Sequence, residues 1–277
     1  MSKIGCIFDD VLDNKRVLDY FCVKNCTSSM KNKTNINQLL KKIPSGTVVT
    51  AGKLKSLGVG CSLVQRYVQG GWLSRVSNGA YTRLNEKADL NGALYALQEE
   101  GLHVHQGGQS ALANIYGKLQ YVRGNSPVHL FAPRGTNLPK WFVNAYGGQY
   151  RLYLTDFLPP EMGMSERNFG AFTLKESSLE RALLELCYMV PKSVSAQEAF
   201  EITETIQVLK PDLLQKLLES CSQVKVNRLV LCFGELAYTQ WREVLDETNI
   251  DLGHGKRRID AGGTLNKKYG LVMKVER

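Results

Sequence analysis

Between residues 35 and 84, short runs with helical or strand periodicity are interrupted every few positions by glycine, proline or polar turn residues. Only short helices and strands can form there. An apolar stripe with helical spacing predicts a first helix over residues 36–43. Thr50 is a good N-cap for a second helix over residues 51–57. After a tight glycine-containing connection, a third helix is predicted over residues 61–69.

A β-hairpin is predicted directly after the third helix. Residues 72–76 alternate like a strand, the turn at Asn78 is followed by glycine, and residues 80–84 form the returning strand. Two short helices, a third helix and a hairpin together predict a winged helix-turn-helix over residues 30–88. Trp72 is expected to pack the hairpin onto the helices as part of the core.

The charge of this N-terminal segment points to a function. Residues 30–85 contain nine basic side chains and no acidic one, while the whole chain of 277 residues has a net charge of +9. Residues 86–253 hold 15 basic and 20 acidic side chains, and residues 254–277 hold 7 and 2. A basic surface without acidic residues is expected where a protein approaches phosphate groups.

The third predicted helix divides into an apolar and a polar face. The four side chains on the polar face have helical spacing: Ser62, Gln65, Arg66 and Gln69. Gln can form two hydrogen bonds to adenine, and Arg can do the same with guanine. An ordinary solvated helix face is the alternative. Because the helix precedes a predicted hairpin, we favour DNA recognition.

The middle of the chain predicts a small sheet. Residues 86–102 are amphipathic and link the hairpin to the second domain, and a helix is predicted over residues 108–116. Four strand-like runs rich in aromatic and β-branched residues lie between residues 126 and 174: 128–132, 142–146, 150–154 and 169–174.

Beyond residue 174 the apolar period changes to 3.6, which predicts a helical bundle. Capping boxes are predicted at Ser177 and at Ser195, the second opening a helix to about residue 209. Further helices are predicted from Pro211, over residues 224–237 and over residues 241–245. The fold class is therefore α+β: an N-terminal winged helix-turn-helix, then a mixed domain over residues 89–277 with a small β-sheet and a C-terminal helical bundle.

Residues 1–29 are polar and weakly patterned, and we interpret them as an extension before an ancestral start at Met30. The seven scattered cysteines are expected to be reduced thiols in a cytosolic protein. Cys22 and Cys26 lack a second ligand pair, so no metal site is expected there. His103 and His105 are either a metal pair or, as we favour, polar packing residues.

Several function classes are excluded or disfavoured. No apolar run is long enough to span a membrane, the N-terminus does not resemble a secretory signal, and a cytoplasmic location is expected. No hydrolase, metalloprotease or nucleotide-binding motif occurs, so neither enzymatic activity nor a cofactor is expected. Residues 251–258 combine two glycines with three consecutive basic residues, which predicts either an anion-binding turn or, as we favour, a solvated loop.

These motifs resemble those of AbiEi-type antitoxins, which belong to type IV toxin–antitoxin systems linked to abortive phage infection. The resemblance covers residues 30–277. At the wing it rests on Gly71-Trp72-Leu73 and Asn78-Gly79-Ala80-Tyr81. In the C-terminal half it rests on residues 178–185, Trp241, residues 252–259, Gly263 and residues 267–271.

The resemblance implies an autorepressor that binds inverted repeats in double-stranded operator DNA upstream of its own operon. Ser62, Gln65, Arg66 and Gln69 would read bases, and the backbone or minor-groove contacts would be Lys53, Lys55, Arg75, Asn78 and Arg83, with Arg75 and Arg83 flanking the wing tip. The C-terminal domain would counteract a nucleotidyltransferase-like toxin without forming a stable complex. Its antitoxin surface would include Lys256, Arg257, Arg258, Lys267 and Lys268.

Two other functions remain open at this stage. One is a winged-helix transcriptional regulator whose C-terminal domain senses a small ligand. The other is an enzyme that acts on a nucleotide or RNA, with the basic tail as a phosphate clamp. A nucleotidyltransferase-like gene directly downstream would favour the antitoxin over the ligand sensor.

Overall fold

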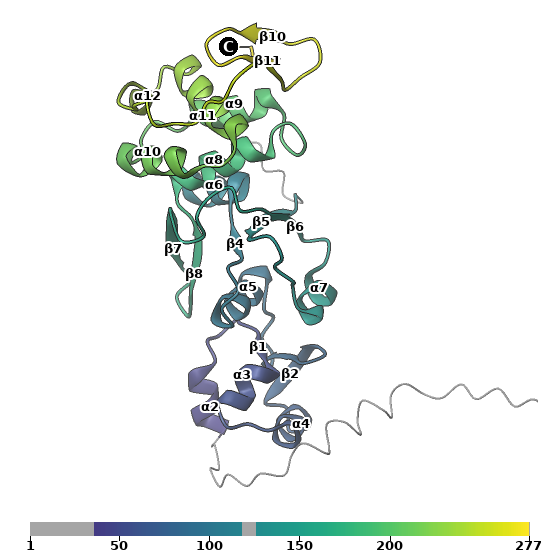
Figure 1. Cartoon of the computed structure of the whole chain (residues 1–277). Helices are drawn as coiled ribbons and strands as arrows, with labels where there is room; N and C mark the ends of the chain where they lie inside the picture. The colour runs from purple at the N-terminus through teal and green to yellow at the C-terminus, as the bar shows by residue number, and fades with distance from the viewer. Residues whose placement is uncertain (1–35, 118–125, 277) are drawn as a thin grey trace, which may run out of the picture.

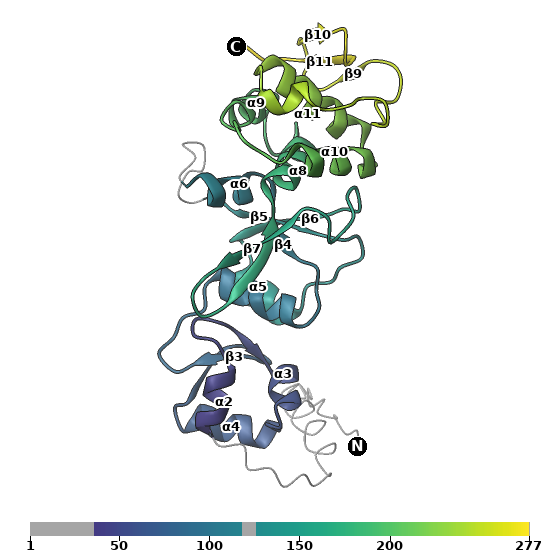
Figure 2. The ribbon, with the colours of Figure 1, turned by 90° about the vertical axis from the view of Figure 1, so that its left-hand side faces the viewer.

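The computed structural model describes residues 36–117 and 126–276 of the chain. The molecule is elongated, with three regions stacked along its long axis (Figure 1, Figure 2). Short helices and a hairpin lie at one end, a five-stranded sheet in the middle, and a helical bundle with the C-terminal tail at the other end. The fold class is α+β. The predicted extension with Cys22 and Cys26, and the proposed start at Met30, lie outside the described residues.

The N-terminal region consists of three helices and a three-stranded antiparallel sheet with the strand order β1-β3-β2. The helices are α2 (Ile36–Lys42), α3 (Ala51–Ser56) and α4 (Cys61–Gln69), and the strands are β1 (Val49–Thr50), β2 (Leu73–Ser77) and β3 (Ala80–Arg83). These bounds confirm the three predicted helices and the hairpin. The predicted N-cap is also confirmed, because the Thr50 hydroxyl accepts a hydrogen bond from the Lys53 backbone N–H at 3.1 Å.

The prediction that Trp72 belongs to the core is wrong. Trp72 is 46% exposed, whereas the next residue, Leu73, is 1% exposed and packs with Leu54 and Val64. Strand β2 begins at Leu73, and side chains alternate between the two faces of a strand. Because Leu73 points inward, Trp72 lies on the outer side.

The middle region contains α5 (Leu90–Glu99) and a sheet with the order β6-β5-β4-β8-β7. Its strands are β4 (His105–Gln106), β5 (Val128–Ala132), β6 (Tyr150–Leu154), β7 (Met164–Asn168) and β8 (Thr173–Ser177). The β5–β6 and β4–β8 pairs are parallel, and the β4–β5 and β7–β8 pairs are antiparallel.

Helix α5 connects the N-terminal region to this sheet. On one side, the Val48 backbone N–H donates to the Gly92 carbonyl at 3.1 Å. A Cβ on Gly92 would lie 1.9 Å from a backbone oxygen, so only glycine permits this approach. On the other side, the Gln98 side chain bonds the backbone of Val104 and Lys175. Contacts on both faces thus hold α5 between the two regions.

Two predicted strands are wrong. Residues 142–146 lie in helix α7 (Lys140–Tyr146), where the buried side chains of Phe142 and Tyr146 are four positions apart and Val143 between them is exposed. That spacing is helical, and the aromatic content of the run obscured it. Residues 169–172 form the connection between β7 and β8 rather than a separate strand.

The C-terminal region is a helical bundle around the largest hydrophobic cluster. Its helices are α6 (Gly108–Tyr116), α8 (Leu179–Met189), α9 (Ala196–Glu204), α10 (Pro211–Ser220), α11 (Val224–Leu236) and α12 (Gln240–Glu243). The cap at Ser195 and the first-turn position of Pro211 are confirmed. Helix α9 ends five residues before the predicted position.

The predicted cap of α8 is wrong by one residue. The Ser178 hydroxyl, not that of Ser177, accepts the bond from the Arg181 backbone N–H. Ser177 is fully buried and donates its hydroxyl to Glu185 instead. Tertiary contact thus decides between two adjacent serines that both fit the local pattern.

The tail forms a small three-stranded sheet from β9 (Arg257–Arg258), β10 (Thr264–Asn266) and β11 (Leu271–Met273). Leu271 and Met273 are buried against the bundle, while both arginines of β9 are exposed. Within the described ranges, no helix has the length and apolar character needed to cross a membrane.

Candidate nucleic-acid interface

Helix α4 presents the predicted polar face to solvent. All four side chains of that face are exposed: Ser62, Gln65, Arg66 and Gln69. On the opposite side Val64 is 4% exposed and Tyr67 and Val68 are half-buried. The helix lies at the end of the molecule farthest from the C-terminal bundle (Figure 1). Among residues 36–117 and 126–276, the face is therefore not covered by other parts of the molecule.

Short connections fix α4 relative to its neighbours. Gly58 has φ of +84° and turns the chain out of α3, so that the Val59 backbone N–H donates to the Leu54 carbonyl at 2.9 Å. At the other end, the Trp72 backbone N–H donates to the Tyr67 carbonyl at 2.8 Å. These bonds hold α4 between α3 and the hairpin.

The hairpin places Asn78 and Arg75 at the surface. Asn78 is exposed at the tip, and Gly79 supplies the φ of +78° that the turn requires. Arg75 is exposed and opposite Tyr81, with its guanidinium 5.7 Å from the centre of the Tyr81 ring. This cation–π contact limits the freedom of Arg75.

Arg83 does not flank the hairpin tip. It pairs with Leu73 at the base of the hairpin, and one of its amino groups donates to the backbone carbonyls of Leu40 and Ile43 at the end of α2. The Leu40 carbonyl also accepts from the Ile43 backbone N–H at 3.4 Å, and Arg83 adds the side-chain donor of a C-terminal cap.

The two lysines of α3 differ in their surroundings. Lys53 points to α5, where its ammonium pairs with Glu99 at 3.0 Å. Lys55 is exposed, and no ion pair of Lys55 occurs within the described part of the chain. The structure thus brings four predicted residues together on α4, leaves Lys55, Arg75 and Asn78 exposed nearby, and gives Lys53 and Arg83 protein partners.

The basic tail forms a second candidate surface at the opposite end. Lys256, Arg257 and Arg258 are exposed, and Arg228 of α11 supports their loop by donating to the carbonyls of Leu252 and Gly255. These hydrogen bonds anchor the loop to α11, while its three basic side chains are exposed to solvent.

The two remaining tail lysines are unequal. Lys267 is exposed. Lys268 pairs with Glu235 of α11 and lies 3.6 Å from Glu247. The hydrogen bond to Glu235 raises the pKa of Lys268 above its usual value. Lys268 therefore shares two carboxylates with Arg242, whereas Lys267 and residues 256–258 are exposed.

Sequence reasoning missed a buried polar cluster around Glu185 of α8. Its carboxylate accepts from Ser177 at 2.6 Å and from Arg181 at 2.8 Å, and it pairs with His105 at 3.0 Å. It also accepts from the Gly108 backbone N–H at 3.0 Å. The sequence signals were the i, i+4 spacing of Arg181 and Glu185 and the two consecutive glycines, Gly107 and Gly108, at the start of α6.

The glycines of this cluster are required by its geometry. A Cβ on Gly107 would lie 2.0 Å from the Glu185 carboxylate, so a larger residue cannot approach it. His105 belongs to this cluster, whereas His103 is exposed and pairs with Glu161 at 2.8 Å. The two histidines therefore do not act together.

Comparison with known proteins gives two family matches. A model of the N-terminal domain of AbiEi antitoxin transcriptional regulators matches residues 32–124. A second model, of AbiEi antitoxin transcriptional regulators of type IV toxin–antitoxin systems, matches residues 125–274. Among solved structures, the RV2827C protein from Mycobacterium tuberculosis is similar, with a TM-score of 0.55 and 15% identity over 86% of this chain and 89% of that chain. This likeness shows a shared fold. No match was found among curated proteins.

Proposed function

The chain belongs to the AbiEi family of antitoxin transcriptional regulators of type IV toxin–antitoxin systems, and we propose that it represses its own operon and counteracts a nucleotidyltransferase-like toxin. Residues 30–88 bind double-stranded operator DNA at inverted repeats, and residues 89–277 carry the antitoxin activity. Both activities take place in the cytoplasm.

The DNA-binding proposal rests chiefly on the exposed polar face of α4. Helices α3 and α4 correspond to the helix-turn-helix and strands β2 and β3 to the wing of a winged helix-turn-helix. No acidic residue occurs between positions 30 and 85, so nothing within this segment repels phosphates. A helix that combines such surroundings with exposed Gln and Arg side chains suits the major groove.

The proposed contacts divide into two groups. Base edges are read from the α4 face by Ser62, Gln65, Arg66 and Gln69. The DNA backbone or minor groove is contacted by Lys53, Lys55, Arg75, Asn78 and Arg83. Of the second group, Lys53 and Arg83 must exchange present partners, Glu99 and the α2 carbonyls, for phosphate. Lys55, Arg75 and Asn78 are available without rearrangement.

A gel-shift experiment with DNA from upstream of the operon tests this proposal. Arg66→Ala should weaken specific binding by about 1–3 kcal/mol, because a bidentate contact to a base is lost. Lys216→Ala is the matched control, since it removes a positive charge from an exposed site on α10 at the other end of the chain. Equal affinity for operator and random DNA, unchanged by Arg66→Ala, would contradict base recognition.

The antitoxin proposal rests on family membership and on the basic tail. The surface consists of Lys256, Arg257 and Arg258 together with Lys267 and Lys268, and it opposes the toxin without a stable complex. Co-expression with the toxin of the same operon tests this. The chain should restore growth of toxin-producing cells although tagged toxin and antitoxin do not purify together. Rescue that depends on a purifiable complex would contradict the proposed mode.

A further inference from the structure

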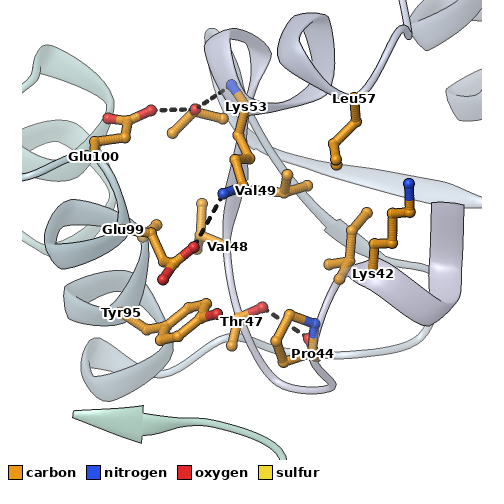
Figure 3. Close-up of a pocket in the computed structure, with 13 residues that line it drawn as sticks. Lys42, Pro44, Thr47, Val48, Val49, Lys53, Leu57, Tyr95, Glu99 and Glu100 are labelled. Atoms are coloured by element: carbon orange, nitrogen blue, oxygen red, sulfur yellow. Dashed lines mark hydrogen bonds and ion pairs between the residues drawn. The ribbon is translucent and has the colours of Figure 1, made fainter.

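A cavity of about 440 Å³ lies where the N-terminal region meets α5 (Figure 3). Tyr95, Glu99 and Glu100 of α5 lie on one side, and Lys42 and Leu57 lie on the other. Most of the remaining lining is apolar: Ile43, Pro44, Val48, Val49 and Ala96. A mostly apolar cavity of this size between two structural units is typical of small-molecule sites.

The acidic side chains of the cavity already have partners. Glu99 pairs with Lys53 at 3.0 Å, and Glu100 accepts a hydrogen bond from the Thr50 hydroxyl. Tyr95 lies beside the first pair: burial and the negative charge of Glu99 raise its pKa, so its hydroxyl stays protonated and can donate a hydrogen bond. A cationic ligand would therefore have to displace Lys53 before it could bind Glu99, whereas Glu100 accepts one hydrogen bond from a neutral hydroxyl.

Lys42 is different. It lines the cavity and is exposed at the end of α2, and among residues 36–117 and 126–276 no hydrogen bond or ion pair of its ammonium occurs. Of the two lysines that line the cavity, Lys42 is thus the one that can bind a ligand without breaking an ion pair in the described chain. A ligand that complements the cavity combines an apolar body with one anionic group.

We propose that this cavity binds a small organic acid, whose apolar body lies against Val49, Leu57 and Ala96 and whose carboxylate pairs with Lys42. In the alternative in which the chain senses a ligand, the sensing site therefore lies beside α5 and not within the C-terminal bundle. The wall formed by α3 and its cap at Thr50 belongs to the predicted DNA-binding region, so an occupant directly contacts that region.

The site is tested on the full-length chain without DNA, so the outcome is independent of operator binding. Two acids serve as probes, 4-phenylbutyrate and octanoate, each compared with its neutral amide by isothermal titration calorimetry. Each acid should bind saturably, and its amide should bind about fivefold or more weakly, because the amide lacks the charge-assisted bond to Lys42. Absence of saturable binding by both acids would overturn the proposal.

Two lysine variants localise the binding. Lys42→Gln should weaken acid binding by about fivefold or more and remove the preference for acid over amide. Lys41→Gln is the matched control, because Lys41 is the adjacent exposed lysine of α2 and does not line the cavity. Equal loss of affinity in both variants would show binding elsewhere and would overturn the assignment.

A third variant tests the apolar part. Ala96 is 5% exposed and lines the cavity, so Ala96→Leu adds volume inside it and should abolish binding of both acids and both amides. Circular dichroism checks that this variant folds. Should it not fold, the exposed Lys42→Gln substitution decides the question alone. Undiminished binding to folded Ala96→Leu would contradict the proposed location.

Discussion

Glu185 places a carboxylate in the interior of the molecule, where its side chain is fully buried. Burial acts to raise its pKa, but the charges and hydrogen bonds of His105, then Arg181 and Ser177, outweigh burial and hold the pKa below its usual value. Glu185→Ala should therefore lower the free energy of unfolding by about 3–5 kcal/mol, because Arg181 is left buried without its partner.

Urea unfolding measures this loss. Glu219→Ala is a suitable control, since Glu219 is exposed on α10 and its truncation should change stability by no more than about 0.5 kcal/mol. Similar effects of the two substitutions would show that the buried cluster contributes little to folding.

His129 gives the protein a predictable response to acid. Burial, then the charge of Arg151, lowers the pKa of His129 from 6.5 to about 4. Between pH 6.5 and 4 the unfolded chain takes up a proton that the folded chain refuses, so stability falls as pH falls through this range. The loss from this residue should approach about 3 kcal/mol at pH 4.

His129→Asn should flatten the dependence of the unfolding free energy on pH between 6.5 and 4. His254→Asn is the control, because His254 is exposed in the tail loop. If both variants follow the same pH profile as the original chain, His129 does not cause the acid sensitivity.

At the scale of elements, two arginines of one hairpin should behave differently. Arg83→Met removes the donor to the last carbonyls of α2 and should cost about 1–3 kcal/mol of stability. Arg75→Met removes an exposed side chain from the same hairpin and should leave stability within about 0.5 kcal/mol. Thermal and urea unfolding of the two variants compare them, and equal stability would refute a capping role for Arg83.

The elements that the sequence predicted well are those with local signals. Thr50, Ser195 and Pro211 each mark a helix start by their own chemistry, and each helix begins where predicted. Helix α7 has no side-chain cap, and its aromatic run favours strand or helix according to what it packs against.

In the candidate site, too, the features with local sequence signals were predicted, and those that depend on distant residues were not. The face of α4 follows from helical spacing alone, and the structure has it exposed as predicted. Arg83 bonds the carbonyls of Leu40 and Ile43, 40 or more positions away, and Glu185 pairs with His105, 80 positions away in sequence. Such pairings depend on the assembled fold, so the spacing of residues did not predict them.

For the whole molecule, the distance between the two basic surfaces predicts that their roles can be separated. The combined substitution Lys256→Ala, Arg257→Ala and Arg258→Ala should abolish rescue from the toxin and leave operator binding unchanged, because α4 lies at the other end of the molecule (Figure 1). Growth rescue and gel shift are measured on the same full-length variant. Loss of operator binding would refute the separation.

The position of α5 between the two ends has a consequence for regulation. With α4 in the groove of the proposed operator, α5 and the sheet hold the basic tail away from the DNA, on the side that faces the surrounding solution. Under the proposed function, a copy bound to the operator thus keeps residues 256–258 away from the DNA. Repression and protection then need not compete for the same molecules, and the cell can oppose its toxin without first releasing the promoter.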